Sequence, residues 1–194
     1  FLLGNKTRHQ RYTITARQIL RPPADFVWMP KMTSGLMHIS GSDARVDGIA
    51  WTRFWLFGVF PVADARGADV ARSAAFRAAM ESIWVPPSLL PENAVRWMQP
   101  GPNTAQVVFE RLDPEIMLEL TLAPDGAVRE IIGQRWSNAN PKNVFKLQPF
   151  GGTVEAERTF SGYTIPSRLA VGNHFRTDAY LAFFQADVTS ASFR

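Results

Sequence analysis

One segment of the chain, from Asp64 to Pro91, carries a clear helical pattern, and this segment constrains the fold most. Its large apolar residues recur at the spacing i, i+4, i+7 and i+8, which places them on one face of an α-helix. These residues are Phe76, Met80, Ile83 and Trp84, with the small Ala75 and Ala79 beside them. Pro86 and Pro87 end the helix, because proline disfavours the α conformation in the preceding residue and lacks an amide hydrogen. We predict one main helix whose apolar face packs into the core.

The polar residues of this segment lie away from the apolar face. They are Arg72, Ser73, Arg77 and Glu81. Arg77 and Glu81 stand four residues apart, a spacing at which opposite charges on a helix form an ion pair worth ~0.2–0.5 kcal/mol. The pattern therefore predicts a pair between these two side chains.

The rest of the chain has the pattern of short strands separated by turns. From Arg11 to Leu20, polar and apolar residues alternate, as they do in a strand with one buried face. Further strands are predicted at 26–32, 36–45, 49–60, 94–98, 105–110, 116–122, 128–136, 153–160, 163–175 and 180–193. Because short turns join them, we expect an antiparallel meander. We predict a single domain over residues 1–194 that is mainly β (α+β): a curved open antiparallel sheet or half-barrel of about 10–12 strands with one main helix packed on it.

The predicted strand from Ile49 to Phe60 is apolar on both faces. One face holds Trp51, Arg53, Trp55 and Phe57, and the other holds Phe54, Leu56 and Phe60. A strand that is covered on one side only alternates cleanly between apolar and polar residues. We therefore expect the helix to cover one face, and further core or a ligand cavity to cover the other.

Composition narrows the possible partners. The chain is 46% hydrophobic and 20% charged, with a formal net charge of +4 and an isoelectric point near 9.8. Its basic residues are scattered, so the basic stripe of a nucleic-acid-binding protein is missing, whereas a membrane surface is a possible partner. No cysteine is present, which excludes disulfides and thiolate ligands. Composition does not fix the compartment, so both the cytoplasm and the cell envelope stay open.

The sequence contains none of the familiar catalytic, nucleotide-binding or zinc-binding motifs. The three histidines, His9, His38 and His174, do not have the spacing of metal ligands. We predict neither a metal site nor a cofactor.

The best candidates for catalysis lie near the end of the chain. Arg168 and His174 share one face of a predicted strand, and small residues between them leave room on that face. Asp178 follows His174 by four residues and could orient its imidazole, so that the histidine acts as a general base. The alternative is a surface loop in which Asp178 satisfies backbone groups.

The aromatic residues suggest a binding site. The chain contains six tryptophans and fourteen phenylalanines, and a curved sheet built from them could enclose an apolar ligand. Arg53 could bind the polar head of such a ligand, stack on a tryptophan, or pair with Glu81. Arg135 and Trp136 form a third candidate pair. The predicted ligand-binding residues are Trp51, Arg53, Phe54, Trp55, Phe57, Phe76, Met80 and Trp84.

Several segments together resemble a known family. They are GVFPVADARGADVAR, ESIWVPPSLLP, LQPFGG, RTFSGYTIPSRL and GNHFRTDAY, and the likeness extends from about Arg17 to Phe193. The chain resembles an uncharacterised bacterial domain-of-unknown-function family. The resemblance implies a fold similar to the lipoprotein-carrier (LolA/LolB-like) half-barrel, an open antiparallel sheet curled around an apolar concavity with helical cover. It implies no catalytic residues.

Three hypotheses for function follow. The first is a binding protein that holds a lipid or another apolar small molecule in the concavity of a curved sheet, with Arg53 or Arg168 at its polar head. The second is a small hydrolase or isomerase that uses His174 and Asp178 with Arg168. The third is a structural or interaction module with a filled core and no ligand.

Overall fold

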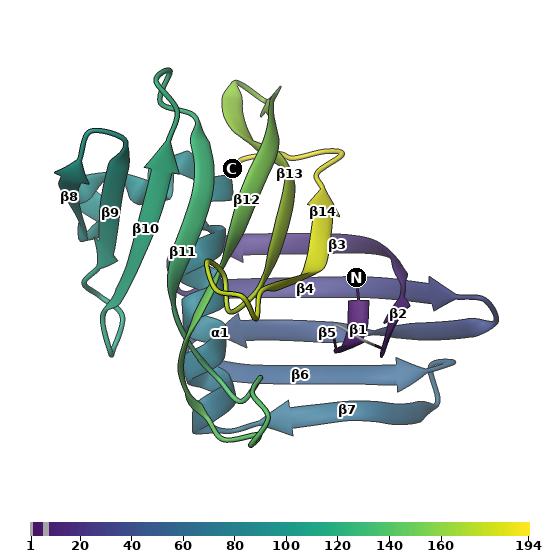
Figure 1. Ribbon diagram of the computed structural model, residues 1–194. Coiled ribbons are helices and arrows are strands. Elements are labelled where there is room, and N and C mark those ends of the chain that lie inside the picture. Colours follow the sequence, from purple (N-terminus) through teal and green to yellow (C-terminus); the bar gives the residue numbers. More distant parts are fainter. Residues whose placement is uncertain (1, 6–7) are drawn as a thin grey trace.

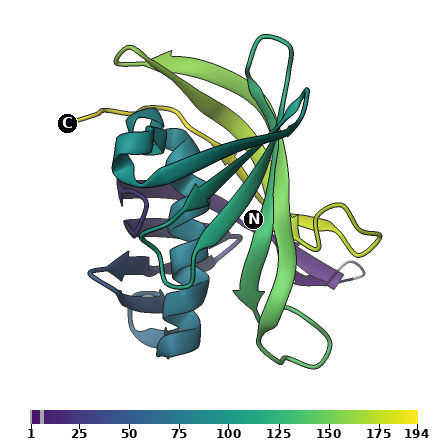
Figure 2. The same cartoon turned by 90° about the vertical axis from the view of Figure 1, so that its left-hand side faces the viewer.

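The computed structural model describes residues 2–5 and 8–194, with side chains from Tyr12 onward. Two large antiparallel sheets dominate it, and a single α-helix lies between them (Figures 1 and 2). A small hairpin pairs β1 (Leu2–Asn5) with β2 (Arg8–Arg11). The predicted mainly β fold with one main helix is confirmed. No helix in the described part of the chain is long and apolar enough to cross a membrane.

The N-terminal sheet is a meander of five strands that pair in the order of the sequence. They are β3 (Thr13–Arg21), β4 (Asp25–Ser34), β5 (Met37–Val46), β6 (Ile49–Leu56) and β7 (Phe60–Arg66). Alternation along each strand gives this sheet an inner face, which meets the helix, and an outer face.

The C-terminal sheet is a second meander, of seven strands, and its strands run crosswise to those of the first (Figure 1). They are β8 (Val95–Gly101), β9 (Thr104–Phe109), β10 (Ile116–Leu122), β11 (Val128–Ser137), β12 (Lys146–Phe160), β13 (Tyr163–Asn173) and β14 (Leu181–Asp187). Where one curved sheet was expected, the strands divide into two, because the helix interrupts the meander between β7 and β8.

The predicted strand at 49–60 is wrong in its length, because the chain reverses after Leu56. Phe57 and Gly58 adopt positive φ angles of 55° and 73°, which close a tight turn into β7. The Phe57 amide donates to the carbonyl of His38 across the sheet, at 2.8 Å. The glycine that marks this turn lies between two apolar stretches, so the sequence looked like one continuous strand. Other bounds differ as well, among them those of β12, which begins at Lys146, and of β14, which ends at Asp187.

The helix packs on both sheets. Helix α1 (Ala68–Met80) continues into three short 3-10 helices, η1 (Glu81–Trp84), η2 (Pro86–Leu89) and η3 (Pro91–Asn93). The predicted apolar stripe of Phe76, Met80 and Ile83 is buried against the C-terminal sheet. Gly133 of β11 makes room for it, since a Cβ there would lie 2.7 Å from the Phe76 ring.

A second face of the helix contacts the N-terminal sheet. Ala74 and Ala78 pack there against Phe26, Trp28 and Ala50. Because alanine projects little from the helix, the backbones of helix and sheet approach closely. Both sheets therefore share one helix, whereas the single domain over residues 1–194 stays a prediction.

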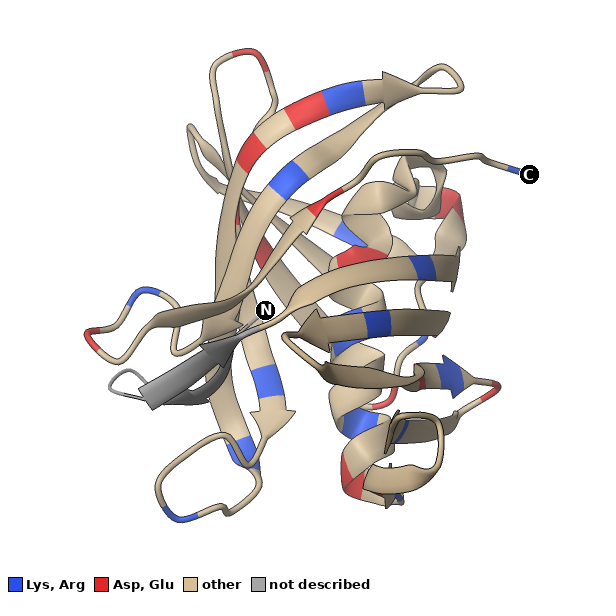
Figure 3. Cartoon of the chain, turned by 90° about the vertical axis from the view of Figure 1, so that its right-hand side faces the viewer, with Lys and Arg blue, Asp and Glu red and all other residues tan. Residues whose placement is uncertain are grey.

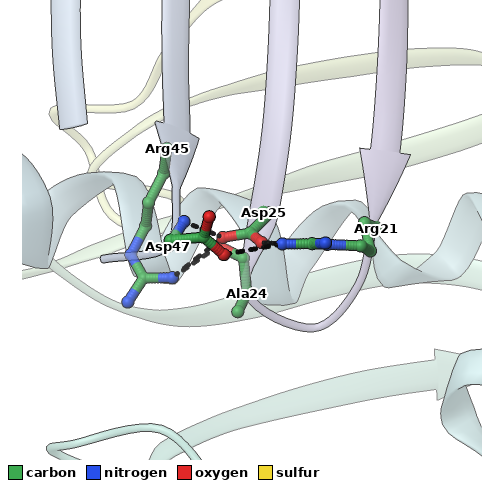
Figure 4. Close-up of polar contacts among 5 residues, drawn as sticks. All are labelled: Arg21, Ala24, Asp25, Arg45 and Asp47. Atoms are coloured by element: carbon green, nitrogen blue, oxygen red, sulfur yellow. Dashed lines mark hydrogen bonds and ion pairs between the residues drawn. The ribbon is translucent and has the colours of Figure 1, made fainter. Parts of the chain in front are cut away.

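A buried carboxylate joins two turns at one end of the N-terminal sheet (Figure 4). Asp25, at the start of β4, is 8% exposed. It accepts hydrogen bonds from the Arg21 guanidinium and from the backbone amide of Asp47, the latter at 3.1 Å. Arg45 lies 3.6 Å from the same carboxylate and donates to the carbonyl of Ala24 at 2.7 Å. Asp25 therefore fixes the β3–β4 turn against the β5–β6 turn.

We expect the substitution Asp25→Ala to lower the free energy of unfolding by about 2–3 kcal/mol. The physical reason is that Arg45 and the Asp47 amide would lose their buried acceptor. Urea denaturation of wild type and variant measures this difference. The control is Asp187→Ala, which removes an exposed ion pair with Arg168 and should leave stability nearly unchanged. Equal losses in the two variants would contradict the role given to Asp25.

Candidate functional site

A cavity of about 540 Å³ lies between the two sheets. Its walls are the inner face of the N-terminal sheet, the last turn of α1 with η1, and the facing strands of the C-terminal sheet. Most of its lining is apolar and includes Phe54, Met80, Trp84, Phe150 and Val171. The polar side chains that reach it are Asp43, Thr52, Arg77, Glu81, Arg135 and Thr153.

The first polar feature of the cavity is an ion cluster around Arg77. The Arg77 guanidinium pairs with Asp43 of β5 and, at 2.7 Å, with Glu81. Its carbon also lies 4.4 Å from the centre of the Phe26 ring and 5.0 Å from that of Trp28. The predicted pair of Arg77 with Glu81 is thus confirmed. Both side chains are mostly buried at the cavity wall, although they lie away from the apolar stripe of the helix.

For Glu81 and for Arg77, burial and ion pairing shift the pKa in opposite directions. The pKa of Glu81 is raised, because burial disfavours its charge more than the Arg77 guanidinium favours it. The pKa of Arg77 is also raised: burial opposes its charge, but the attraction of Glu81 and Asp43 outweighs that cost. Gln18 of β3 donates to the second oxygen of Glu81 at 2.5 Å, which completes the cluster.

The second polar feature is Arg135 on β11. Its side chain points to the same side of the sheet as the buried Ile131, four residues earlier. Its Nε donates to the hydroxyl of Ser73 on α1 at 3.0 Å, and its guanidinium lies 4.8 Å from the centre of the Phe150 ring. Among the described side chains, Arg135 forms no ion pair within 4 Å. Burial, followed by repulsion from Arg77, lowers its pKa to about 10.

The predicted ligand-binding residues do not all reach the cavity. Phe54, Met80 and Trp84 line it, and the indole nitrogen of Trp84 donates to the carbonyl of Pro166 at 2.9 Å. Phe76 lies in the core behind the wall, with its ring against Phe150. The remaining four are Trp51, Arg53, Trp55 and Phe57, which are not among the lining residues.

Arg53 and its neighbours lie on the outer face of the N-terminal sheet, because Phe54 and Thr52 take the inner positions of β6. Arg53 faces Asp64 of β7 at 3.7 Å, so the expected alternative pairing with Glu81 is not formed. The indole of Trp51 donates to the Ser42 hydroxyl at 3.0 Å. Both faces of β6 are largely apolar, so the sequence pattern did not show which of them meets the helix.

The candidate catalytic residues also lie away from the cavity lining. His174 has a positive φ angle of 60° in the loop after β13, and its ring Nε2 lies 3.0 Å from the carbonyl of Ala139. Asp178 is exposed in the same loop. Arg168 projects from the exposed side of β13 and pairs with Asp187 at 2.7 Å. His9 lies outside the residues whose side chains are described.

Sequence reasoning missed the cavity roles of Arg77, Glu81 and Asp43, and gave Arg135 only as a secondary candidate. A signal for Arg135 exists in β11, where its spacing from Ile131 puts both on the buried face. Among the side chains that the structure describes, no three His, Asp or Glu residues gather as metal ligands do.

Comparison with known proteins adds one finding. A family model described as "Family of unknown function (DUF6544)" matches residues 3–186. No curated protein and no solved structure matches the chain.

The raised pKa of Glu81 gives stability a defined dependence on pH. A carboxyl group with a raised pKa in the folded state stabilises the fold below its ordinary value of 4.5, and this contribution is lost as pH rises through the folded-state value. Glutamine cannot titrate. We therefore expect the unfolding free energy of Glu81→Gln, relative to wild type, to increase as pH rises above 4.5. Urea denaturation at a series of pH values measures this difference, and a difference independent of pH would contradict it.

Glu119 provides a control of opposite sign. A hydrogen bond from Arg176 lowers the pKa of Glu119, so its stabilising contribution is present above 4.5 and is lost as pH falls through the folded-state value. Wild type should therefore be more stable than Glu119→Gln at neutral pH. The difference in their free energies of unfolding should decrease in acid.

Proposed function

We propose that this chain, which belongs to the family of unknown function DUF6544, binds a lipid or another apolar small molecule in the cavity between its two sheets. The observation that carries the proposal is the cavity itself. Its volume of about 540 Å³ lies within the range of small-molecule sites, and its lining combines a large apolar area with a few convergent polar groups. An unfilled apolar space of this size costs stability unless a ligand fills it.

The helix is the natural cover of this site. Met80 and Trp84 reach the cavity from the last turn of α1 and from η1, while the sheets supply the other walls. This arrangement supports the likeness to lipoprotein-carrier half-barrels, in which a sheet and helical cover enclose an apolar concavity. That likeness stays a prediction, and the proposal stands on the cavity alone.

The two alternatives have less support. A hydrolase or isomerase built on His174 and Asp178 would act in the loop after β13, and neither residue is among those that line the cavity. A structural module with a filled core would leave no space of this volume between its sheets.

The hairpin ends of the N-terminal sheet support a membrane surface as partner. Leu36, at the β4–β5 end, and Phe57, Val59, Phe60 and Val62, at the β6–β7 end, are each more than half exposed. Val62 also lines the cavity, so the apolar surface continues into the site. Basic positions on this side of the molecule are scattered among acidic ones (Figure 3). We therefore propose that apolar contact, more than charge, brings these ends to a bilayer.

Filling the cavity should abolish ligand binding. In Val171→Trp, the indole would occupy space beside Phe150, so the neutral fluorescent probe N-phenyl-1-naphthylamine should lose most of its binding to the protein. Fluorescence titration measures the affinity. The control is Val144→Trp, which adds the same ring at an exposed loop position and should bind like wild type. Wild-type protein that does not bind the probe, and yields no apolar molecule by solvent extraction and mass spectrometry, would contradict the proposal.

Removing apolar side chains from the β6–β7 end should weaken contact with membranes. We expect Val59→Ser combined with Phe60→Ser to reduce co-sedimentation with phosphatidylcholine vesicles by about tenfold or more, because burial of each side chain in lipid is lost. Leu90→Ser, which changes an exposed apolar residue after η2, is the matched control. Equal vesicle binding by wild type and the double variant would rule out this contact.

A further inference from the structure

We infer that the ligand of the cavity is an amphiphile with a carboxylate head, and that Arg135 together with Ser73 binds this carboxylate. The inference rests on the proposed function and names the chemical class of its ligand. A single-chain fatty acid has the required combination of one negative charge and an apolar tail.

The two arginines at the cavity differ in the partners of their guanidinium groups. Arg77 already pairs with two carboxylates, those of Asp43 and Glu81, so the protein's own acids occupy its donors. Arg135 bonds only to the neutral hydroxyl of Ser73 among the described side chains. An arginine side chain has five N–H donors, and the single bond to Ser73 uses the Nε donor and leaves the terminal nitrogens for a ligand.

The position of Arg135 lets a ligand use those donors. Its side chain is part of the cavity lining, beside the ring of Phe150 and across from the last turn of α1. Burial disfavours its charge and lowers its pKa to about 10, yet this value keeps the guanidinium protonated at neutral pH. An anion that enters the cavity would therefore meet a cation that forms no ion pair within 4 Å among the described side chains, because the nearby carboxylates of Asp43 and Glu81 pair with Arg77.

The geometry favours a carboxylate over other anions. The terminal nitrogens of arginine form a planar fork that binds a carboxylate through two parallel hydrogen bonds. A phosphate monoester carries nearly two charges at neutral pH and would need a second unpaired cation. Among the side chains described at the cavity, the only other arginine is Arg77, and the protein's own acids already occupy it. The apolar lining then holds the tail.

Competition between two probes that differ only in their head groups tests the inference. Dodecanoate and 1-dodecanol are each titrated against bound N-phenyl-1-naphthylamine at neutral pH. In wild type we expect dodecanoate to displace the probe at a concentration at least about tenfold lower than dodecanol, because a charge-assisted hydrogen bond in a buried site is worth more than a neutral one.

Variants assign the preference to the residue. Arg135→Met should bind dodecanol as wild type does and lose the preference for dodecanoate, whereas Arg135→Lys, which keeps the charge, should retain part of it. The matched control, Arg168→Gln, removes an exposed arginine and should keep the full preference. The comparison of dodecanoate with dodecanol on wild type tests the inference even if Arg135→Met does not fold.

The failures of the two proposals can be told apart. Equal displacement by dodecanoate and dodecanol in wild type would overturn the carboxylate assignment and leave the apolar binding function in place. A preference that survives in Arg135→Met would also overturn the assignment. Displacement by neither compound would overturn both.

Discussion

The packing of α1 between two sheets is the contact on which the rest of the structure depends. The helix presents alanines to the N-terminal sheet and large apolar side chains, led by Phe76, to the C-terminal sheet. Neither sheet could bury its inner face by itself. A helix between two sheets also holds them apart, so the space next to it must be filled by side chains or by a guest. Here much of that space is the cavity, and its position follows from the helix.

Burying a charged side chain in an apolar space costs desolvation free energy, which partners must offset. Desolvation of a guanidinium is unfavourable unless a carboxylate or several acceptors replace the water. Arg77 meets this requirement through Asp43 and Glu81, from two different elements, and thereby ties β5 to the end of the helix. Arg135 meets it only in part, through Ser73. A fully compensated cation beside an incompletely compensated one is the arrangement expected where one has a structural role and the other binds a ligand.

Local pattern predicted the elements well because each one has its own period. The spacing of Phe76, Met80 and Ile83 identified the helix, and alternation identified the strands. The pattern could not show that Ala74 and Ala78 form a second contact face, because alanine is compatible with both exposed and buried positions. Phe57 adopts a positive φ angle that is uncommon for a phenylalanine, so the turn after β6 was hidden. Arg53 and Trp51 lie on the outer face of β6, away from the cavity, because Ala50, Thr52 and Phe54 take the inner positions. Arg77 was placed only away from the apolar stripe, since sequence alone does not show which charges find partners in the interior.

The two meanders have a consequence for how the chain assembles. Every strand pair in the two large sheets joins neighbours in sequence, so each hairpin closes a short loop at low entropic cost. Contacts between elements far apart in sequence include those of α1 with β10 and β11 and of η1 with β13. Topologies dominated by local pairing fold faster than those that must first close long loops. We expect the hairpins of each half to form early and the docking of the two sheets across the helix to be the slow step, which would make the cavity the last part of the molecule to take shape.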